Sequence, residues 1–198
     1  MARTKWREVR TFFGLVLLGI VVSGCRSPQP HPAPSVTAAI EVRNNAASLL
    51  YDLLGDEKNV SKLLIIKRDR EELHRAIKDV SKTADTAHKT LERLAKEDAS
   101  LDLKRTALPP GEKATREAEG KTRAGELLRA SGADFEFKLL LTQTEALGYA
   151  ENLAKVAAVN DARPEHAAVF REIGAEMHRL HGEVLALLRG GTGHASAK

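Results

Sequence analysis

The segment LHRAIKDVSKTADTAHKTLERL, at residues 73–94, has an apolar residue at alternating intervals of four and three. These residues are Leu73, Ile77, Val80, Ala84, Ala87, Leu91 and Leu94. Because an α-helix has about 3.6 residues per turn, this spacing puts them on one helical face. Asp69 with Glu72 three residues later has capping-box spacing, with Asp69 as the N-cap. The segment therefore predicts a long amphipathic helix that buries one stripe.

Four further helices follow from similar patterns on either side of this segment. A first helix is expected over about 36–67, with Gly55 near its middle, where it could instead divide in two, and a turn near 68–70. A short polar helix is expected over about 112–130, after the break at Pro109 and Pro110. A fourth begins at Asp134, and a fifth begins at Pro164, where proline suits the first turn.

The predicted core is the apolar stripe of each long helix. In the first helix it consists of Ile40, Ala47, Leu50, Leu54, Val60, Leu63 and Leu64. In the fourth it consists of Phe135, Leu139, Ala146, Ala150, Leu153 and Ala157, with Gln143 in the same stripe. In the fifth it consists of Phe170, Ile173, Met177, Leu180, Val184 and Leu187.

The predicted fold class is all-α, an antiparallel four-helix bundle with one additional short helix. The long link before the fourth helix favours a crossover connection.

The N-terminus carries the pattern of a bacterial export signal. Four cations precede an uncharged stretch at 12–22, and small residues follow it. Cys25 comes next and is the single cysteine of the 198-residue chain. The cations are Arg3, Lys5, Arg7 and Arg10. An eleven-residue apolar stretch is about half of the roughly 20 residues that a membrane-spanning helix needs, so an uncleaved signal anchor is disfavoured.

Val22, Ser23, Gly24 and Cys25 resemble the lipobox of bacterial lipoproteins. The resemblance implies that residues 1–24 are a cleaved signal peptide and that the Cys25 thiol receives a diacylglycerol, often with a third acyl chain on the new amino terminus. Two or more acyl chains anchor a protein stably to a membrane. Arg26, in place of an aspartate, implies an outer-membrane anchor with the protein facing the periplasm.

The composition after Cys25 divides the rest of the chain. Residues 25–35 contain four alternating prolines and predict an extended tether at about 3.1 Å per residue. Residues 36–189 form the helical domain, and the glycine-rich residues 190–198 are expected to be a disordered tail. The four prolines are Pro28, Pro30, Pro32 and Pro34.

Charge and aromatic content argue against a nucleic-acid partner. The signal peptide carries four cations and Glu8, which leaves 27 basic against 26 acidic residues in the mature chain. No clustered basic footprint therefore remains. The aromatic residues after Cys25 are too scattered to form a base-stacking platform. They are Tyr51, Phe135, Phe137, Tyr149 and Phe170.

The helical part resembles a family of bacterial exported proteins of unknown function, described as outer-membrane proteins with a ferritin-like bundle. The resemblance covers roughly residues 45–188. The family usually has a histidine four residues after the glutamine, whereas this chain has Leu147 there. The residues that carry the resemblance are Gly55, His88, Leu91, Leu94, Leu108, Pro109, Ser131, Gly132, Phe135, Gln143, His178 and His181.

A ferritin-like bundle raises the question of a metal site. Glu71 and His74 have the Glu-x-x-His spacing of di-iron proteins, and Asp85 with His88 is a weaker version of it. His178 and His181 have the i, i+3 spacing that could chelate a metal. The weak candidates are therefore His74, His88, His178 and His181, but no metal or cofactor is predicted. The preferred interpretation places His88 and His181 in interhelical hydrogen bonds and Gln143 as a satisfied buried amide.

No catalytic motif accompanies these residues. The chain has no Gly-x-Ser-x-Gly elbow, and its single cysteine is assigned to lipidation. We therefore expect a non-enzymatic structural or interaction module of the cell envelope, with the membrane and an unidentified periplasmic protein as its partners. The alternative is a metal-binding or metal-dependent ferritin-like protein. A third possibility is a homo-oligomer that uses an exposed face around Phe170 and Met177.

Overall fold

The computed structural model describes residues 35–65, 70–104 and 106–195. Within these residues all regular structure is helical, which confirms the all-α prediction. None of the described helices combines the length and the hydropathy that crossing a membrane requires. The elements are α1 (Val36–Glu57), the 3-10 helix η1 (Val60–Ile65), α2 (Glu71–Glu97), α3 (Pro110–Arg129), α4 (Gly132–Val159) and α5 (Pro164–Ala195).

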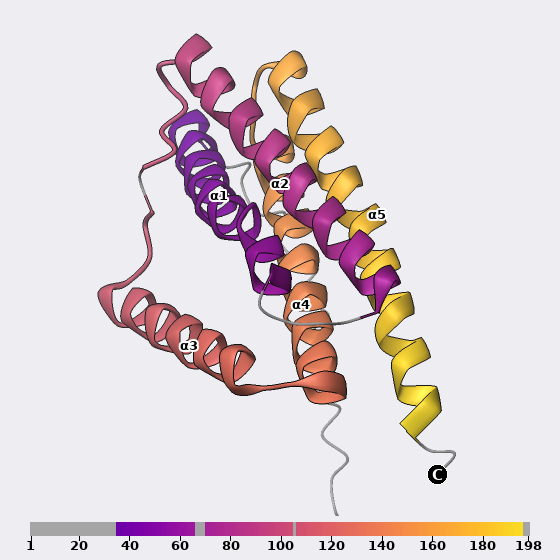
Figure 1. Cartoon of the computed structure of the whole chain (residues 1–198). Helices are drawn as coiled ribbons and strands as arrows, with labels where there is room; N and C mark the ends of the chain where they lie inside the picture. Colours follow the sequence, from indigo (N-terminus) through magenta and orange to yellow (C-terminus); the bar gives the residue numbers. More distant parts are fainter. Residues whose placement is uncertain (1–34, 66–69, 105, 196–198) are drawn as a thin grey trace, which may run out of the picture. The chain divides into compact units, whose positions relative to one another are not determined.

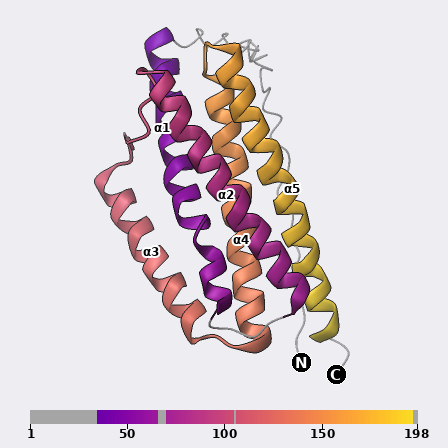
Figure 2. The same ribbon diagram turned by 45° about the horizontal axis from the view of Figure 1, so that its top comes forward.

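Four of these helices surround a common core. α1 packs against α2 and α4, and α5 also packs against α2 and α4. Figures 1 and 2 show that neighbouring helices in this ring are antiparallel, while α2 and α4 run in the same direction. α3 lies outside the ring, and together with its connections it returns the chain from the end of α2 to the start of α4. The described helices therefore form a bundle whose second hairpin follows a crossover.

The stripe that predicted α2 is confirmed in full. All seven of its apolar residues are buried, and none is more than 6% exposed. The predicted cap is wrong by one residue, because the N-cap is Arg70, without a side-chain cap hydrogen bond. Asp69 itself lies outside the described residues. Glu71 and Glu72 occupy the first turn, where negative charge interacts favourably with the helix dipole.

α1 ends ten residues earlier than predicted, although Gly55 does not divide it. Side-chain donors bond to carbonyls at the end of α1 that a further helical turn would otherwise have bonded. Asn59 Nδ2 donates to the Gly55 carbonyl at 3.0 Å, and Ser81 Oγ donates to the Lys58 carbonyl at 2.5 Å. Such bonds satisfy the carbonyls at a helix end. The prediction that Ile40 lies in the core is wrong, because Ile40 is 36% exposed.

The ends of α4 and α5 also differ from the predictions. α4 begins at Gly132, two residues before Asp134, and Gly132 has φ 55°, a left-handed conformation that favours glycine. Leu147 is buried in the core, while Ala146 is partly exposed. α5 continues to Ala195, past the predicted end of the domain at 189. Gly190, Gly191 and Gly193 weaken a helix by only about 1 kcal/mol each, whereas proline would stop it.

α3 has little contact with the rest of the protein. Leu127 is its single buried residue. Arg116 donates to Tyr149 Oη at 2.9 Å and lies over the Tyr149 ring at 5.4 Å, and Arg123 pairs with Glu145 at 2.6 Å. These contacts are solvent-exposed, and each exposed ion pair contributes at most about 1 kcal/mol. The crossover helix is therefore held mainly by surface electrostatics.

Salt should loosen α3 selectively. At 1 M NaCl the Debye length falls to about 3 Å, so loss of an ion pair worth up to about 1 kcal/mol should raise amide exchange in α3 roughly fivefold. Amides of α2, whose apolar stripe is buried, should keep their protection. Hydrogen exchange with and without salt measures both helices in one sample. Arg123→Gln should reduce the salt effect, and a salt response as large in α2 as in α3 would contradict this account.

Candidate functional site

The predicted lipidation site lies outside the described residues. This applies to Cys25 and to Val22, Ser23 and Gly24 before it. Their assignment therefore stays a prediction from sequence, and the candidate sites below belong to the helical bundle that follows them.

Two of the four candidate histidines, His74 and His88, lie on α2, and the other two, His178 and His181, lie on α5. His74 and His181 are partly buried, His88 is buried, and His178 is exposed and lies 3.1 Å from Glu151 Oε2. Among the described residues, no three or more His, Cys, Asp or Glu side chains are arranged to hold a metal ion. Two residues of the family resemblance do meet, because a Cβ added at Gly55 would lie 3.4 Å from His88 Nε2.

His88 belongs to a small polar contact between α1 and α2. Its ring stacks on Tyr51 with centroids 4.0 Å apart. Its Nδ1 lies 3.5 Å from Lys58 Nζ and 3.6 Å from Glu92 Oε1, and Tyr51 donates to Glu92 at 2.9 Å. Burial, and then the charge of Lys58, lower the pKa of His88 below its usual value. The imidazole is therefore mainly neutral at pH 7 and acts as a packing and hydrogen-bonding group.

Glu57 of α1 and Gln143 of α4 form a carboxyl–amide pair, of which the sequence predicted only Gln143 in a core stripe. Gln143 of α4 is 2% exposed and adjoins Glu57 of α1. Burial raises the pKa of Glu57 to about 7, although the Gln143 amide acts in the opposite direction. Glu57 Oε2 and Gln143 Oε1 are shielded from solvent and have no hydrogen-bond partner among the described residues. The expectation that Gln143 is fully satisfied is therefore wrong for its oxygen.

A cluster of ionisable side chains lies at one end of the bundle, and we call Arg43, Asp98, Asp161 and His166 the polar end cluster. Arg43 and Asp98 are buried, as is the Asp161 side chain. Arg43 Nη1 lies 3.5 Å from a carboxylate oxygen of both aspartates. Its Nη2 donates to the Ser100 carbonyl at 2.7 Å. One guanidinium thus joins α1 to the segment after α2 and to the α4–α5 turn.

The remaining contacts of the polar end cluster come from α5 and the turn before it. Arg163 pairs with Asp98 Oδ1 at 3.1 Å, and His166 Nδ1 lies 3.6 Å from Asp98 Oδ2. Burial disfavours the charge of Asp98 most strongly. Hydrogen bonds from Ser100 and the charges of Arg163 and Arg43 outweigh it and hold the pKa of Asp98 below its usual value. The cluster is therefore suited to fixing three chain segments in place.

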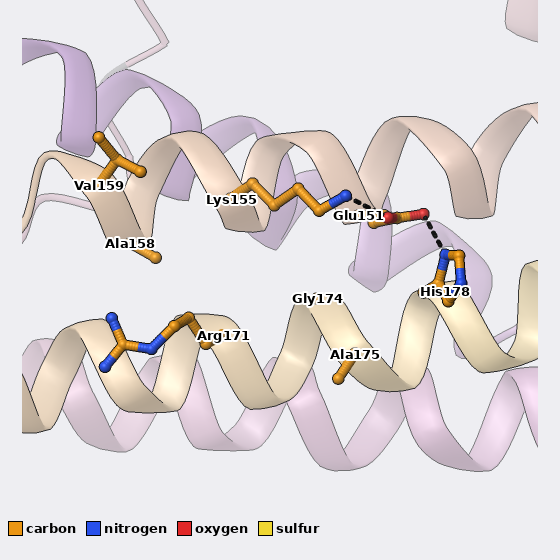
Figure 3. A pocket seen from close by; sticks show the side chains of 8 residues that line it. All are labelled: Glu151, Lys155, Ala158, Val159, Arg171, Gly174, Ala175 and His178. Carbon is orange, nitrogen blue, oxygen red and sulfur yellow. Dashed lines mark hydrogen bonds and ion pairs between the residues drawn. The ribbon is translucent and has the colours of Figure 1, made fainter.

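An open groove runs between α4 and α5 (Figure 3). Its volume is about 580 Å³, within the range of small-molecule sites. The helices approach closely at its floor, because a Cβ added at Gly174 would lie 3.4 Å from Ala154 Cβ. The lining residues are Glu151, Lys155, Ala158 and Val159 from α4 and Arg171, Gly174, Ala175 and His178 from α5.

The two ends of this groove differ in chemistry. At one end Glu151 bridges Lys155 and His178, and the hydrogen bond from Lys155 is the largest cause that lowers the pKa of Glu151. At the other end stands Val159, which is 84% exposed. The lining combines small and apolar residues with four ionisable side chains, which are Glu151, Lys155, Arg171 and His178.

Sequence reasoning missed most of the buried polar residues. Arg43 and Glu57 each fall on the α1 core stripe with Ala47, Leu50 and Leu54, at helical spacing, so the stripe could have identified both as facing the core. Asp98 and Asp161 follow helix ends and have no comparable signal. Comparisons of this chain with protein-family models, with curated proteins and with solved structures found no match.

Proposed function

We propose that this chain is a lipid-anchored helical-bundle protein that faces the periplasm from the outer membrane and acts as a structural or interaction module without enzymatic activity. The observation that carries the proposal is the export-signal pattern that ends in Val22-Ser23-Gly24-Cys25, with the single cysteine of the chain at its end. The membrane is then one partner, held through Cys25, and a periplasmic protein is the other.

The bundle adds support for a ferritin-like connectivity. Such folds join two helical hairpins by one long crossover, and the path from α2 through α3 to α4 has this form. The finer assignment to a ferritin-like, four-helix architecture is part of the proposal. The non-enzymatic assignment rests on the absence of a hydrolase elbow or a phosphate-binding loop from the sequence.

Cys25→Ser tests the anchor directly. The wild-type protein isolated from membranes should begin at an acylated Cys25, whereas the variant should keep residues 1–24 and carry no acyl chain, because the serine hydroxyl cannot form the thioether. Intact mass measurement of both proteins reads the result. Ser27→Ala, two residues past the lipidation site, is the matched control and should be processed like the wild type.

Two results would overturn parts of the proposal. Wild-type protein that retains its first 24 residues would refute the lipid anchor. Elemental analysis of the same sample addresses the metal-binding alternative. Near-stoichiometric iron, zinc or copper that is lost on substitution of His74, His88, His178 or His181 would favour a metal-dependent ferritin-like protein.

A further inference from the structure

The membrane anchor constrains which end of the bundle is nearest the bilayer. Eleven residues, 25–35, precede Val36, the first residue of α1. Fully extended, they span at most about 40 Å. The start of α1 therefore lies within about 40 Å of an anchored Cys25, and the end of the bundle that holds the start of α1 is joined to the anchor directly.

The exposed apolar side chains concentrate at this end. Val159 and Val36 are the two most exposed large hydrophobic residues among the described ones, at 84% and 74%. Val36 starts α1, and Val159 ends α4. Figures 1 and 2 place these helix termini at the same end of the bundle. The 3.5 Å contact between Arg43 and Asp161 ties them together.

Helix geometry explains why apolar residues are exposed here. Val36 and Ile40 continue the core stripe of Arg43, Ala47 and Leu50 at intervals of four and three, but both are exposed. They precede Arg43, which already contacts residues that follow the ends of α2 and α4. Val42 and Val156 are also exposed at this end. The other exposed large hydrophobic residues lie along α3 and on α4 at or before Tyr149, and they are Leu128, Phe137, Leu141 and Tyr149.

Long cationic side chains stand beside the apolar residues. Lys155 is one turn before Val159, and its side chain is mostly exposed; Arg163 follows in the α4–α5 turn and is about half exposed. Such side chains can keep their charge at the level of lipid phosphates while their stems cover apolar surface. Glu41 is an exposed anion on the same part of α1, so the apolar side chains and not net charge must supply the contact.

We propose that this end of the bundle rests on the bilayer surface, with Val36, Ile40 and Val159 in contact with lipid. The proposal rests on the proposed anchor at Cys25. So few apolar side chains bind a membrane weakly by themselves. The anchor compensates, because a tether of at most about 40 Å makes the contact intramolecular and holds this end of the bundle near the bilayer. The groove between α4 and α5 would then open toward the membrane at Val159.

Tryptophan substitution tests the contact on the mature chain, residues 25–198. The single tryptophan of the sequence is Trp6, in the signal peptide, so Val36→Trp and Val159→Trp each introduce the only indole. The core residues of the bundle lie between Ala46 and Leu188, so the mature chain carries its whole described core. Cys25 is coupled chemically to a maleimide phospholipid in phosphatidylethanolamine–phosphatidylglycerol vesicles that contain brominated lipid.

Indole fluorescence should be quenched by the brominated lipid and shifted to shorter wavelength at positions 36 and 159. Phe137→Trp is the matched control, an exposed apolar site elsewhere on α4, and it should be quenched less than positions 36 and 159 or not at all. Equal quenching at the three positions, or stronger quenching at 137, would overturn the proposal. Because the lipid is attached chemically, this outcome is independent of whether cells lipidate Cys25, which the mass measurement decides.

Discussion

Arg43→Met is expected to lower the free energy of unfolding by about 3–5 kcal/mol, the range for breaking a buried ion pair. The substitution leaves Asp98 and Asp161 buried without the guanidinium that contacts both. It also removes both donors to the side-chain oxygen of Asn44, which is buried, while the Ser100 carbonyl keeps the hydrogen bond from Asn44 Nδ2. A buried acceptor that loses its donor costs about 1–3 kcal/mol. Denaturant unfolding at pH 7, followed by circular dichroism, measures the change.

Arg93→Met is the matched control for this experiment. Arg93 is exposed and pairs with Glu97 on the surface of α2, so its loss should change stability by no more than about 0.5 kcal/mol. The triple variant Arg43→Met/Asp98→Asn/Asp161→Asn should recover part of the loss, because neutral amides replace the uncompensated charges. If Arg43→Met costs no more than Arg93→Met, the polar end cluster does not hold the three segments together.

The contribution of the polar end cluster to stability should decrease at acidic pH. The pKa of Asp98 lies below its usual value of 3.8 in the folded protein. Its contribution to stability is therefore fully present above pH 3.8 and is lost as the pH falls through the lower folded pKa. The difference in stability between wild type and Arg43→Met should accordingly narrow as the pH falls below 3.8.

The residues that determine this fold were readable from the sequence to different degrees. The α2 stripe predicted seven buried residues, because its 4,3 spacing has no exception over six intervals. The end of α1 was not predictable in this way. Val60 and Leu64 continue to bury apolar side chains in η1, so the hydrophobic pattern persists while the helix type changes. Periodicity reports which face is buried, not which hydrogen bonds the backbone makes.

The polar end cluster shows a second limit of sequence reasoning. Arg43 and Asp98 are 55 residues apart, and their contact depends on the order in which the helices pack. A charged residue on a core stripe signals that a partner must exist, but the partner's identity needs the three-dimensional arrangement. The groove between α4 and α5 was missed for the same reason, since its lining comes from two helices whose relative rotation the stripes do not fix.

Glu57→Gln is expected to make the protein more stable at pH 8, by up to about 3 kcal/mol. Burial raises the pKa of Glu57 from 4.5 to about 7, and each pKa unit corresponds to about 1.4 kcal/mol. The sign follows from which state binds the proton more tightly. The Glu57 carboxyl keeps its proton up to about pH 7 in the folded protein, whereas it releases the proton near pH 4.5 in the unfolded chain. Wild-type stability from this group is thus full below pH 4.5 and falls as the pH rises toward 7 and above.

The neighbouring amide provides the structural reason why glutamine should fit at position 57. Gln143 Oε1 and Glu57 Oε2 are both acceptors without a partner among the described residues. A proton on Glu57 would let the carboxyl donate to Gln143, and a glutamine amide at position 57 donates without needing that proton. Urea unfolding of wild type and Glu57→Gln at pH 5 and pH 8 measures the effect. The curves should nearly coincide in midpoint at pH 5 and separate at pH 8. Glu41→Gln, an exposed change on the same helix, is the control and should keep the wild-type pH dependence of stability. The contradicting result would be a Glu57→Gln protein that loses stability between pH 5 and pH 8 as steeply as the wild type does. That result would show that Glu57 is ionised in the folded protein.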